Sequence, residues 1–183
     1  MKMIALFLAE GNEEIEALTV VDLCRRAGLD IQTVSVTGQK QVRSSHGILV
    51  EADMLLEDVD FSKVEMLVLP GGMPGTLNLE ACAPLMEQIK AFHQAGKYIS
   101  AICAAPTVFG RAGILEGREA CCYPEMEGDL LGAKVSYAPV VEDGHILTSR
   151  GMGTAIPFGL AIVSRFKGQD YADELAKKIV FSL

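Results

Sequence analysis

Short apolar segments alternate with helical patterns along the chain, and this alternation restricts the fold more than any other feature of the sequence. Apolar runs of strand length recur at residues 3–9, 31–36, 64–69 and 98–102. A strand that is apolar on both faces is typical of a parallel sheet that helices cover on both sides. The sequence therefore predicts an α/β fold with a doubly wound, mostly parallel central sheet.

Helix start and stop signals separate the predicted strands. Asn12 is expected to cap a helix that runs from about Glu13 to Arg26 and stops at Gly28. Further helices are predicted at residues 84–95, 154–166 and 171–180, and further strands at residues 48–52, 119–122, 140–141 and 146–148. A chain of 183 residues that is 50% hydrophobic suits one core better than two. We therefore expect a single domain over residues 1–183.

The charge balance excludes several classes of partner. The formal net charge is -8, and no cluster of Lys and Arg stands out beyond Arg25 and Arg26. Phosphate binding needs a basic face, so we expect no nucleic-acid partner, and anionic membranes are disfavoured for the same reason. No apolar stretch reaches the roughly 20 residues of a membrane helix. Acidic residues follow the first apolar segment at once, which predicts a strand there and not a signal peptide.

The cysteines point to a reducing compartment. There are five of them, an odd number, and no two are spaced as a C-x-x-C pair. This pattern favours neither a disulfide framework nor a zinc ribbon or thioredoxin-type site. We expect a cytoplasmic protein with no metal and no cofactor.

Cys103 is the first candidate functional residue. It follows the apolar run 98–102 and precedes two alanines and Pro106, which suits the first positions of a helix. A side chain at such a strand-to-helix turn lies next to the free N–H groups of the helix start, which are donors for a developing oxyanion. The same helix end is expected to lower the pKa of the thiol below its free value of about 8.5. The alternative is a small buried apolar residue, as most free cysteines are.

Glu16 is the second candidate. On a helix it shares a face with Val20, Leu23 and Ala27, which is otherwise apolar, so its side chain is expected to point inward. Burial raises the pKa of a carboxylic acid by disfavouring its charged form. A protonated Glu16 near Cys103 is able to donate a hydrogen bond to a thiolate or to a sulfinate oxygen. The alternative is a glutamate that begins the polar face of the helix.

Three further features are weaker. Gly71 and Gly72 follow the apolar run 64–69, and their backbone N–H groups are suited to an anion, without the pattern of a P-loop or a dinucleotide site. His46 is the one histidine that we retain as a possible neighbour of a site, and Tyr123 is expected to line the same crevice. In an open α/β sheet, ligands bind at the carboxyl ends of the strands, where the segments after residues 9, 69 and 102 all lie.

Taken together, four motifs resemble the ThiJ/PfpI family, in the branch that contains the Parkinsonism-associated redox protein and the bacterial YajL-type proteins. They are Ala9-Glu-Gly-Asn-Glu-Glu-Ile-Glu16, Leu69-Pro-Gly-Gly72, Ala101-Ile-Cys-Ala-Ala-Pro106 and Leu147-Thr-Ser-Arg-Gly-Met-Gly-Thr154. The resemblance extends over essentially the whole chain and implies a flavodoxin-like sandwich and a homodimer. It also implies that Cys103 is the reactive cysteine, that Glu16 is the protonated acid beside it, and that the Gly72 and Ala104 amides form an anion pocket.

Two departures from the family pattern matter. Protease-like members have a histidine directly after the cysteine, where this chain has Ala104, which argues against a peptidase. Some members of the nearer branch supply a histidine from a Thr-His-Pro segment, where this chain has Cys122, Tyr123 and Pro124. Tyr123 can donate or accept a hydrogen bond at neutral pH, but it does not replace an imidazole as a general base.

The resemblance implies two functions of different classes. The first is a cofactor-independent thiol enzyme, a deglycase or glutathione-independent glyoxalase that acts on small reactive aldehydes or on glycated protein side chains. The second is a redox-sensing stress chaperone whose Cys103 oxidises to a sulfinate. A weaker third alternative is a role in thiazole (thiamine) biosynthesis, against which the absence of a recognised phosphate-binding motif argues. The first two hypotheses use the same residues, so the sequence alone does not separate them.

Overall fold

A seven-stranded sheet runs through the middle of the molecule in the computed structural model, which describes residues 2–182. Its strands lie in the order β10-β11-β7-β6-β1-β2-β5, and all pairs are parallel except β10 with β11. The strands are β1 (Met3–Leu8), β2 (Asp30–Ser35), β5 (Met54–Leu55), β6 (Val64–Leu69), β7 (Tyr98–Ile102), β10 (Val140–Asp143) and β11 (Ile146–Ser149). The predicted mostly parallel sheet is confirmed.

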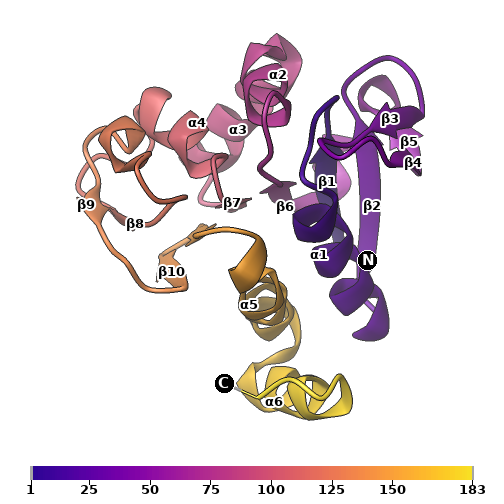
Figure 1. The fold of residues 1–183 in the computed structure, drawn as a ribbon, viewed down its shortest axis with the longest axis vertical. Helices are drawn as coiled ribbons and strands as arrows, with labels where there is room; N and C mark the ends of the chain where they lie inside the picture. The colour runs from indigo at the N-terminus through magenta and orange to yellow at the C-terminus, as the bar shows by residue number, and fades with distance from the viewer. Residues whose placement is uncertain (1, 183) are drawn as a thin grey trace.

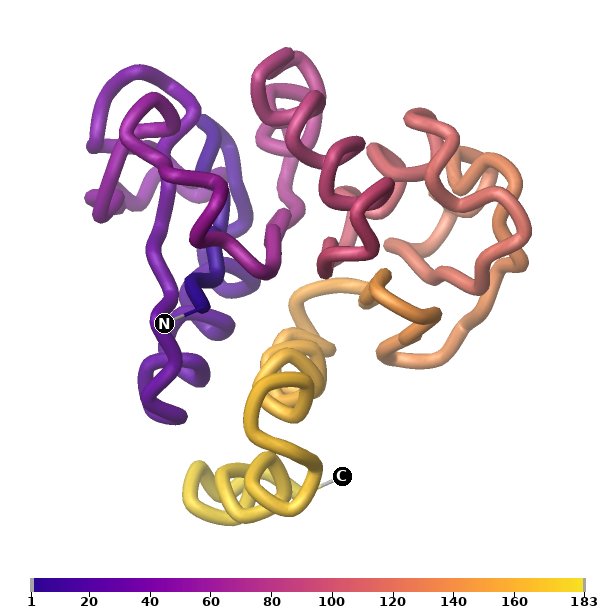
Figure 2. The backbone as a smooth tube through the Cα atoms, turned by 180° about the vertical axis from the view of Figure 1, so that it is seen from behind, coloured from indigo at the N-terminus to yellow at the C-terminus, as the bar shows by residue number. Residues whose placement is uncertain are grey.

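Helices cover both faces of this sheet, as Figure 1 shows. The helices are α1 (Glu14–Arg26), α2 (Gly75–Ala81), α3 (Ala83–Gln94), α4 (Pro106–Arg111), α5 (Ala155–Lys167) and α6 (Gln169–Lys178), with short 3₁₀ turns at Leu56–Asp58, Phe61–Lys63, Glu127–Asp129 and Met152–Thr154. Helix α1 packs against α5, and α5 packs against α6, on one side of the sheet. Seen from behind, α5 and α6 again lie across the sheet from α2, α3 and α4 (Figure 2).

Strand β1 shows why the sheet has to be covered on both sides. Alternate side chains of a strand point to opposite faces. Ile4, Leu6 and Leu8 join the hydrophobic cluster under α1 and α5, while Ala5 and Phe7 join the cluster under α3 and α4. All five side chains are fully buried. The near-continuous apolar sequence of this strand is therefore explained by two cores, one on each face.

Two small sheets lie outside the main one. The antiparallel pair β3 (Gln41–Arg43) and β4 (Leu49–Glu51) forms a hairpin, and β8 (Glu119–Ala120) pairs in parallel with β9 (Lys134–Val135). The predicted strand 119–122 is therefore wrong in its second half. Cys121 and Cys122 lie outside any strand, because the backbone there turns toward the end of β7, where the Tyr123 N–H donates to the Cys103 carbonyl oxygen.

The start of α1 also differs from the sequence-based prediction. Glu13, and not Asn12, is the residue that precedes the helix, and no side chain caps it. Asn12 is fully buried, and its side-chain amide donates to the Ala9 carbonyl oxygen at 2.9 Å. Asn12 therefore stabilises the turn between β1 and α1, and the helix itself begins one residue later than expected. Helix α2 was not predicted, because it begins inside the glycine-rich segment that follows β6.

The strand order reverses direction at one position in the sheet. From β1 the chain moves outward to β2 and β5, and then returns to form β6 on the opposite side of β1. Such a reversal separates the loops that leave two neighbouring strands, and ligands of open α/β sheets bind there. The loops after β1 and β6 flank this point, and β7 is the next strand along. None of the helices formed by residues 2–182 is both long and apolar enough to cross a membrane.

Candidate functional site

Cys103 lies at a strained turn between β7 and α4. Its φ angle is 65°, in the left-handed region that residues with a side chain rarely adopt. Its N–H donates to the Ser149 carbonyl oxygen at 3.0 Å, and its own carbonyl oxygen accepts from the Tyr123 N–H at 2.7 Å. A left-handed residue other than glycine costs about 1–2 kcal/mol, so the surrounding contacts have to impose it. The predicted strand-to-helix turn is present, with the cysteine at its tip.

Glu16 points inward from the first turn of α1. The residue is 1% exposed, and its Oε2 accepts the Gly71 N–H at 2.9 Å. Its other oxygen, Oε1, is buried and has no hydrogen-bond partner among the described residues. Burial raises the pKa of Glu16 to about 7, although hydrogen bonds from Gly71 and Cys103 oppose the shift. Near neutral pH this carboxyl is therefore able both to accept and to donate a proton.

The Cys103 thiol faces this carboxyl. Burial, followed by the charge of Glu16 and a hydrogen bond to it, raises the pKa of Cys103 to about 12. The backbone N–H groups of Ala104 and Gly72 act in the opposite direction, because they donate to the sulfur and favour its anion. The predicted lowering of the thiol pKa is therefore wrong for this arrangement. The sequence showed the helix start, but it did not show that burial of the sulfur and the charge of Glu16 oppose it.

Glycine at position 71 is required by the close approach of the two functional side chains. A Cβ atom added there would lie 2.6 Å from the Cβ of Cys103 and 2.8 Å from Oε2 of Glu16. Both distances are too short for carbon, so any side chain at this position would push Cys103 and Glu16 away from their places. The neighbouring Gly72 has a φ angle of 88° and would collide with the backbone of Glu13. These two glycines bring the loop after β6 against the start of α1.

Of the two remaining predicted site residues, Tyr123 contacts this centre and His46 is bonded elsewhere. Tyr123 is bonded to Cys103 through its backbone, and its ring is half exposed and faces Gly151. His46 forms ion pairs with Glu14 at 3.0 Å and with Glu13 at 3.6 Å. Among the described residues it makes no ion pair or hydrogen bond with Cys103 or Glu16. The structure thus brings Cys103, Glu16, Gly71, Gly72 and Ala104 together, and it engages His46 with a different pair of carboxylates.

Ser149 is a site residue that the analysis of the sequence did not single out. It ends β11, which is hydrogen-bonded to β7 in parallel, and its carbonyl oxygen fixes the N–H of Cys103. Its hydroxyl group bonds Thr154 at 2.7 Å and the Pro139 carbonyl oxygen at 2.8 Å. Its position in the sequence could have indicated this role, because Ser149 lies at the carboxyl end of the strand that neighbours the Cys103 strand.

We predict that the stability of the Glu16→Gln variant, relative to the wild type, increases with pH. The folded chain holds the Glu16 proton up to about pH 7, whereas the unfolded chain releases it near 4.5. The wild type therefore loses stability as the pH rises through this range, by up to roughly 3 kcal/mol, and the glutamine variant does not. Urea unfolding of both proteins at pH 5 and pH 8 measures the difference. Glu87→Gln, at an exposed position, is the matched control and should show no such trend. A constant difference between wild type and Glu16→Gln would contradict the raised pKa.

Comparison with known proteins agrees with this fold. The chain is 38% identical over 181 residues to "Protein DJ-1 homolog B" and 37% identical over 178 residues to "Protein DJ-1 homolog A", both of Arabidopsis thaliana. These matches cover 98% and 96% of the chain but only 41% and 45% of the two relatives, so the chain spans less than half of their length. It is also 32% identical to the "Glutathione-independent glyoxalase DJR-1.2" of Caenorhabditis elegans, over 93% of the chain and 91% of that protein.

Solved structures give the same result. A mutant of the DJ-1 superfamily protein STM1931 from Salmonella typhimurium superposes with a TM-score of 0.95 at 32% identity, and each chain is covered completely. Toxoplasma gondii DJ-1 in an oxidized form superposes with a TM-score of 0.95 at 31% identity, also over both complete chains. Residues 2–165 match the model of the DJ-1/PfpI family. The chain therefore belongs to the DJ-1/PfpI family.

Proposed function

We propose that this protein is a thiol-dependent enzyme that acts on small reactive aldehydes, or on their adducts with protein side chains, without a cofactor. The observation that carries the proposal is the contact between the Cys103 thiol and the buried Glu16 carboxyl, with the Ala104 and Gly72 amides on the sulfur. A nucleophile, a proton acceptor and two anion-stabilising donors are the groups that carbonyl addition needs. The relative named as a glutathione-independent glyoxalase supports this class of reaction.

In the first step, the sulfur attacks the aldehyde carbon of a 2-oxoaldehyde such as methylglyoxal. A carbon–sulfur bond forms while the carbonyl π electrons move to oxygen, and the thiol proton passes to the Glu16 carboxylate. The pKa of Glu16, raised to about 7, makes it a suitable base at neutral pH, whereas a free thiolate is scarce when the thiol pKa is about 12. The Ala104 and Gly72 N–H groups stabilise negative charge that develops on the sulfur or on an oxygen next to it. Glu16 then returns this proton to the alkoxide oxygen, so the step gives a neutral hemithioacetal and leaves Glu16 ionised for the next step.

In the second step, Glu16 transfers a proton between the two adjacent carbons. The proton leaves the carbon that carries the sulfur and reaches the neighbouring carbonyl carbon, while the hydroxyl proton moves to the neighbouring oxygen. The hemithioacetal thereby becomes the thioester of a 2-hydroxy acid. Water then cleaves the thioester, which releases lactate in the case of methylglyoxal and restores the thiol. One water molecule is consumed and no external oxidant or reductant is needed. A glycated side chain offers the same kind of carbon, with an amine or a thiol as the leaving group.

We predict that Cys103→Ala abolishes lactate formation from methylglyoxal and that Glu16→Gln reduces it by roughly a hundredfold or more, because each removes a group that takes part in bond making or proton transfer. Lactate is measured with the purified chain and without added glutathione. The matched control is Cys82→Ser, which removes a partly buried free thiol elsewhere and should retain full turnover. Unchanged turnover in Cys103→Ala would remove the proposal.

A second candidate function is redox sensing by the same sulfur. The solved relative in an oxidized form favours it. When the sulfur is oxidised to a sulfinate, its oxygens lie beside Glu16, whose protonated form donates a hydrogen bond, and near the Ala104 and Gly72 N–H groups. A stress chaperone of this kind responds to oxidation and turns over no aldehyde.

Mild peroxide treatment tests this second function. Peptide mass spectrometry should find two added oxygens mainly on Cys103, because Cys24, Cys121 and Cys122 are buried and less accessible to the oxidant. Oxidation that is spread evenly over all five cysteines would count against a sensor.

We also propose that the protein works as a homodimer in a reducing compartment such as the cytoplasm. Ile15 and Leu18 on α1, and Ile48 and Leu49 at the β3–β4 hairpin, are 40–52% exposed, which is high for large apolar side chains. The five cysteines are all unpaired, which fits a reducing environment. Sedimentation velocity should give twice the chain mass, and Leu49→Glu should shift the protein toward the monomer. A monomeric wild type would contradict the dimer.

A further inference from the structure

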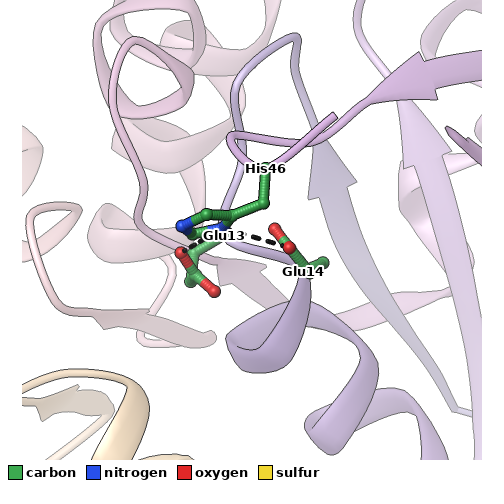
Figure 3. Close-up of side chains that lie close together, drawn as sticks. All are labelled: Glu13, Glu14 and His46. Atoms are coloured by element: carbon green, nitrogen blue, oxygen red, sulfur yellow. Dashed lines mark ion pairs between the residues drawn. The ribbon is translucent and has the colours of Figure 1, made fainter. Parts of the chain in front are cut away.

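Two glutamates and a histidine converge at a point that the proposed reaction does not use. Glu13 and Glu14 lie at the start of α1, and His46 lies in the loop between β3 and β4 (Figure 3). One oxygen of each carboxylate and a ring nitrogen of His46 all lie within 4.8 Å of one another. We propose that these three side chains bind a divalent transition-metal ion, with Zn²⁺ as the probe for it.

The spacing of the three groups suits such an ion. His46 Nδ1 lies 3.0 Å from Glu14 Oε1 and 3.6 Å from Glu13 Oε2. Two ligands of a tetrahedral Zn²⁺, each about 2.0–2.1 Å from the metal, are separated by about 3.4 Å. These two separations bracket this value, and the ligand oxygens of the two glutamates lie within 4.8 Å of one another, so side-chain movements bring all three groups to an ion. Carboxylate and imidazole are ligands that Zn²⁺ and its neighbours in the first transition row accept.

The cluster also holds more acceptors than donors. Glu14 has a side-chain exposure of 6% and Glu13 of 13%, so both carboxylates are largely removed from water. Glu13 Oε1 is buried without a hydrogen-bond partner among the described residues. The Ser45 hydroxyl group lies 3.2 Å from Glu13 Oε2, 3.4 Å from Glu14 Oε2 and 3.1 Å from His46 Nδ1. It has one proton to donate, so it satisfies only one of the two carboxylate oxygens at a time.

A cation resolves this imbalance. Two desolvated carboxylates next to one another repel, and the ion-pair partner that both share in residues 2–182 is His46, whose side chain is 67% exposed. When the metal binds, His46 loses its Nδ1 proton, and the metal takes the place of that proton between the three ligands. The exposed side of His46 leaves room for water as a further ligand. The metal would then tie the loop between β3 and β4 to the start of α1.

This site differs from the sequence-based expectation of no metal. The two glutamates are neighbours in a run of acidic residues, which is commonly a solvated face, and His46 follows far along the chain with no ligand spacing that a motif search recognises. Only the fold brings the hairpin loop over the start of α1, where the Ser45 N–H donates to the Asn12 carbonyl oxygen at 2.8 Å.

Zinc titration of the chain tests the proposal. The parent protein carries Cys103→Ser, so that the site thiol does not compete for the metal, and it is stripped of metal before ZnCl₂ is added against a chromophoric chelator. We expect one zinc ion per chain, and an affinity that falls roughly tenfold or more in both His46→Ala and Glu13→Gln. His93→Ala is the matched control, because His93 pairs with His145 elsewhere on the surface, and it should bind zinc as the parent does.

A second measurement keeps the result independent of enzymatic activity. Zinc should raise the melting temperature of the parent and of His93→Ala, and leave that of His46→Ala unchanged, because a ligand that binds only the folded state stabilises it. The cobalt-substituted parent should show no thiolate-to-metal charge-transfer band. Failure to bind zinc, equal affinity in His46→Ala, loss of binding in His93→Ala, or a thiolate band with cobalt would each overturn the proposal. None of these results depends on aldehyde turnover, so the two proposals fail separately.

Discussion

The contact between two acidic groups that the fold largely removes from water, the Glu16 carboxyl and the Cys103 thiol, determines the chemistry of this structure. Glu16 and Cys103 face one another across Gly71, and burial raises the pKa of both. The charge of Glu16 raises the pKa of the thiol further, whereas the hydrogen bond from the thiol lowers the pKa of Glu16. With a pKa of about 7 for the carboxyl and about 12 for the thiol, the pair loses its first proton from Glu16. The sulfur therefore becomes nucleophilic by giving its proton to Glu16 during attack, much as a serine does with its histidine in hydrolases.

The backbone around this pair leaves it little freedom. The Glu13 N–H donates to the Gly71 carbonyl oxygen at 2.9 Å, and the Gly75 N–H donates to the Gly11 carbonyl oxygen at 3.1 Å. These bonds join the loop after β1 to the loop after β6, at the point where the strand order reverses. Since Cys103 also holds a left-handed backbone conformation, the close contact of sulfur and carboxyl depends on the packing of all three strand ends. Preorganisation of this kind is what an electrostatic catalyst requires.

The sequence predicts which residues come together in this site, because the segments that follow parallel strands meet at one edge of the sheet. Runs that are apolar on both faces identified the parallel strands, and the turn signals after them placed Cys103, Gly71 and Gly72 at one edge of the sheet. Predictions from neighbouring residues alone were wrong where a contact with a distant part of the chain determines the structure or the pKa. Asn12 is a good helix cap by type, yet its amide bonds to the Ala9 carbonyl oxygen. The pKa of the thiol moves upward because burial of the sulfur, and then the charge of Glu16 from another element, outweigh the helix start.

The same atoms suit both candidate functions, the aldehyde-processing enzyme and the redox sensor. The reason is that the pKa of Glu16 is lower than that of Cys103. Attack on an aldehyde and oxidation by peroxide both need the electron pair of an ionised sulfur. In this site, that ionisation is coupled to proton acceptance by Glu16, so both reactions depend on the same carboxylate. The pH dependence of either reaction therefore follows the ionisation of Glu16 and Cys103, and it does not distinguish the enzyme from the sensor. What separates the two functions lies after the first step, because only the enzyme needs Glu16 to return the proton to carbon and to release the thiol again.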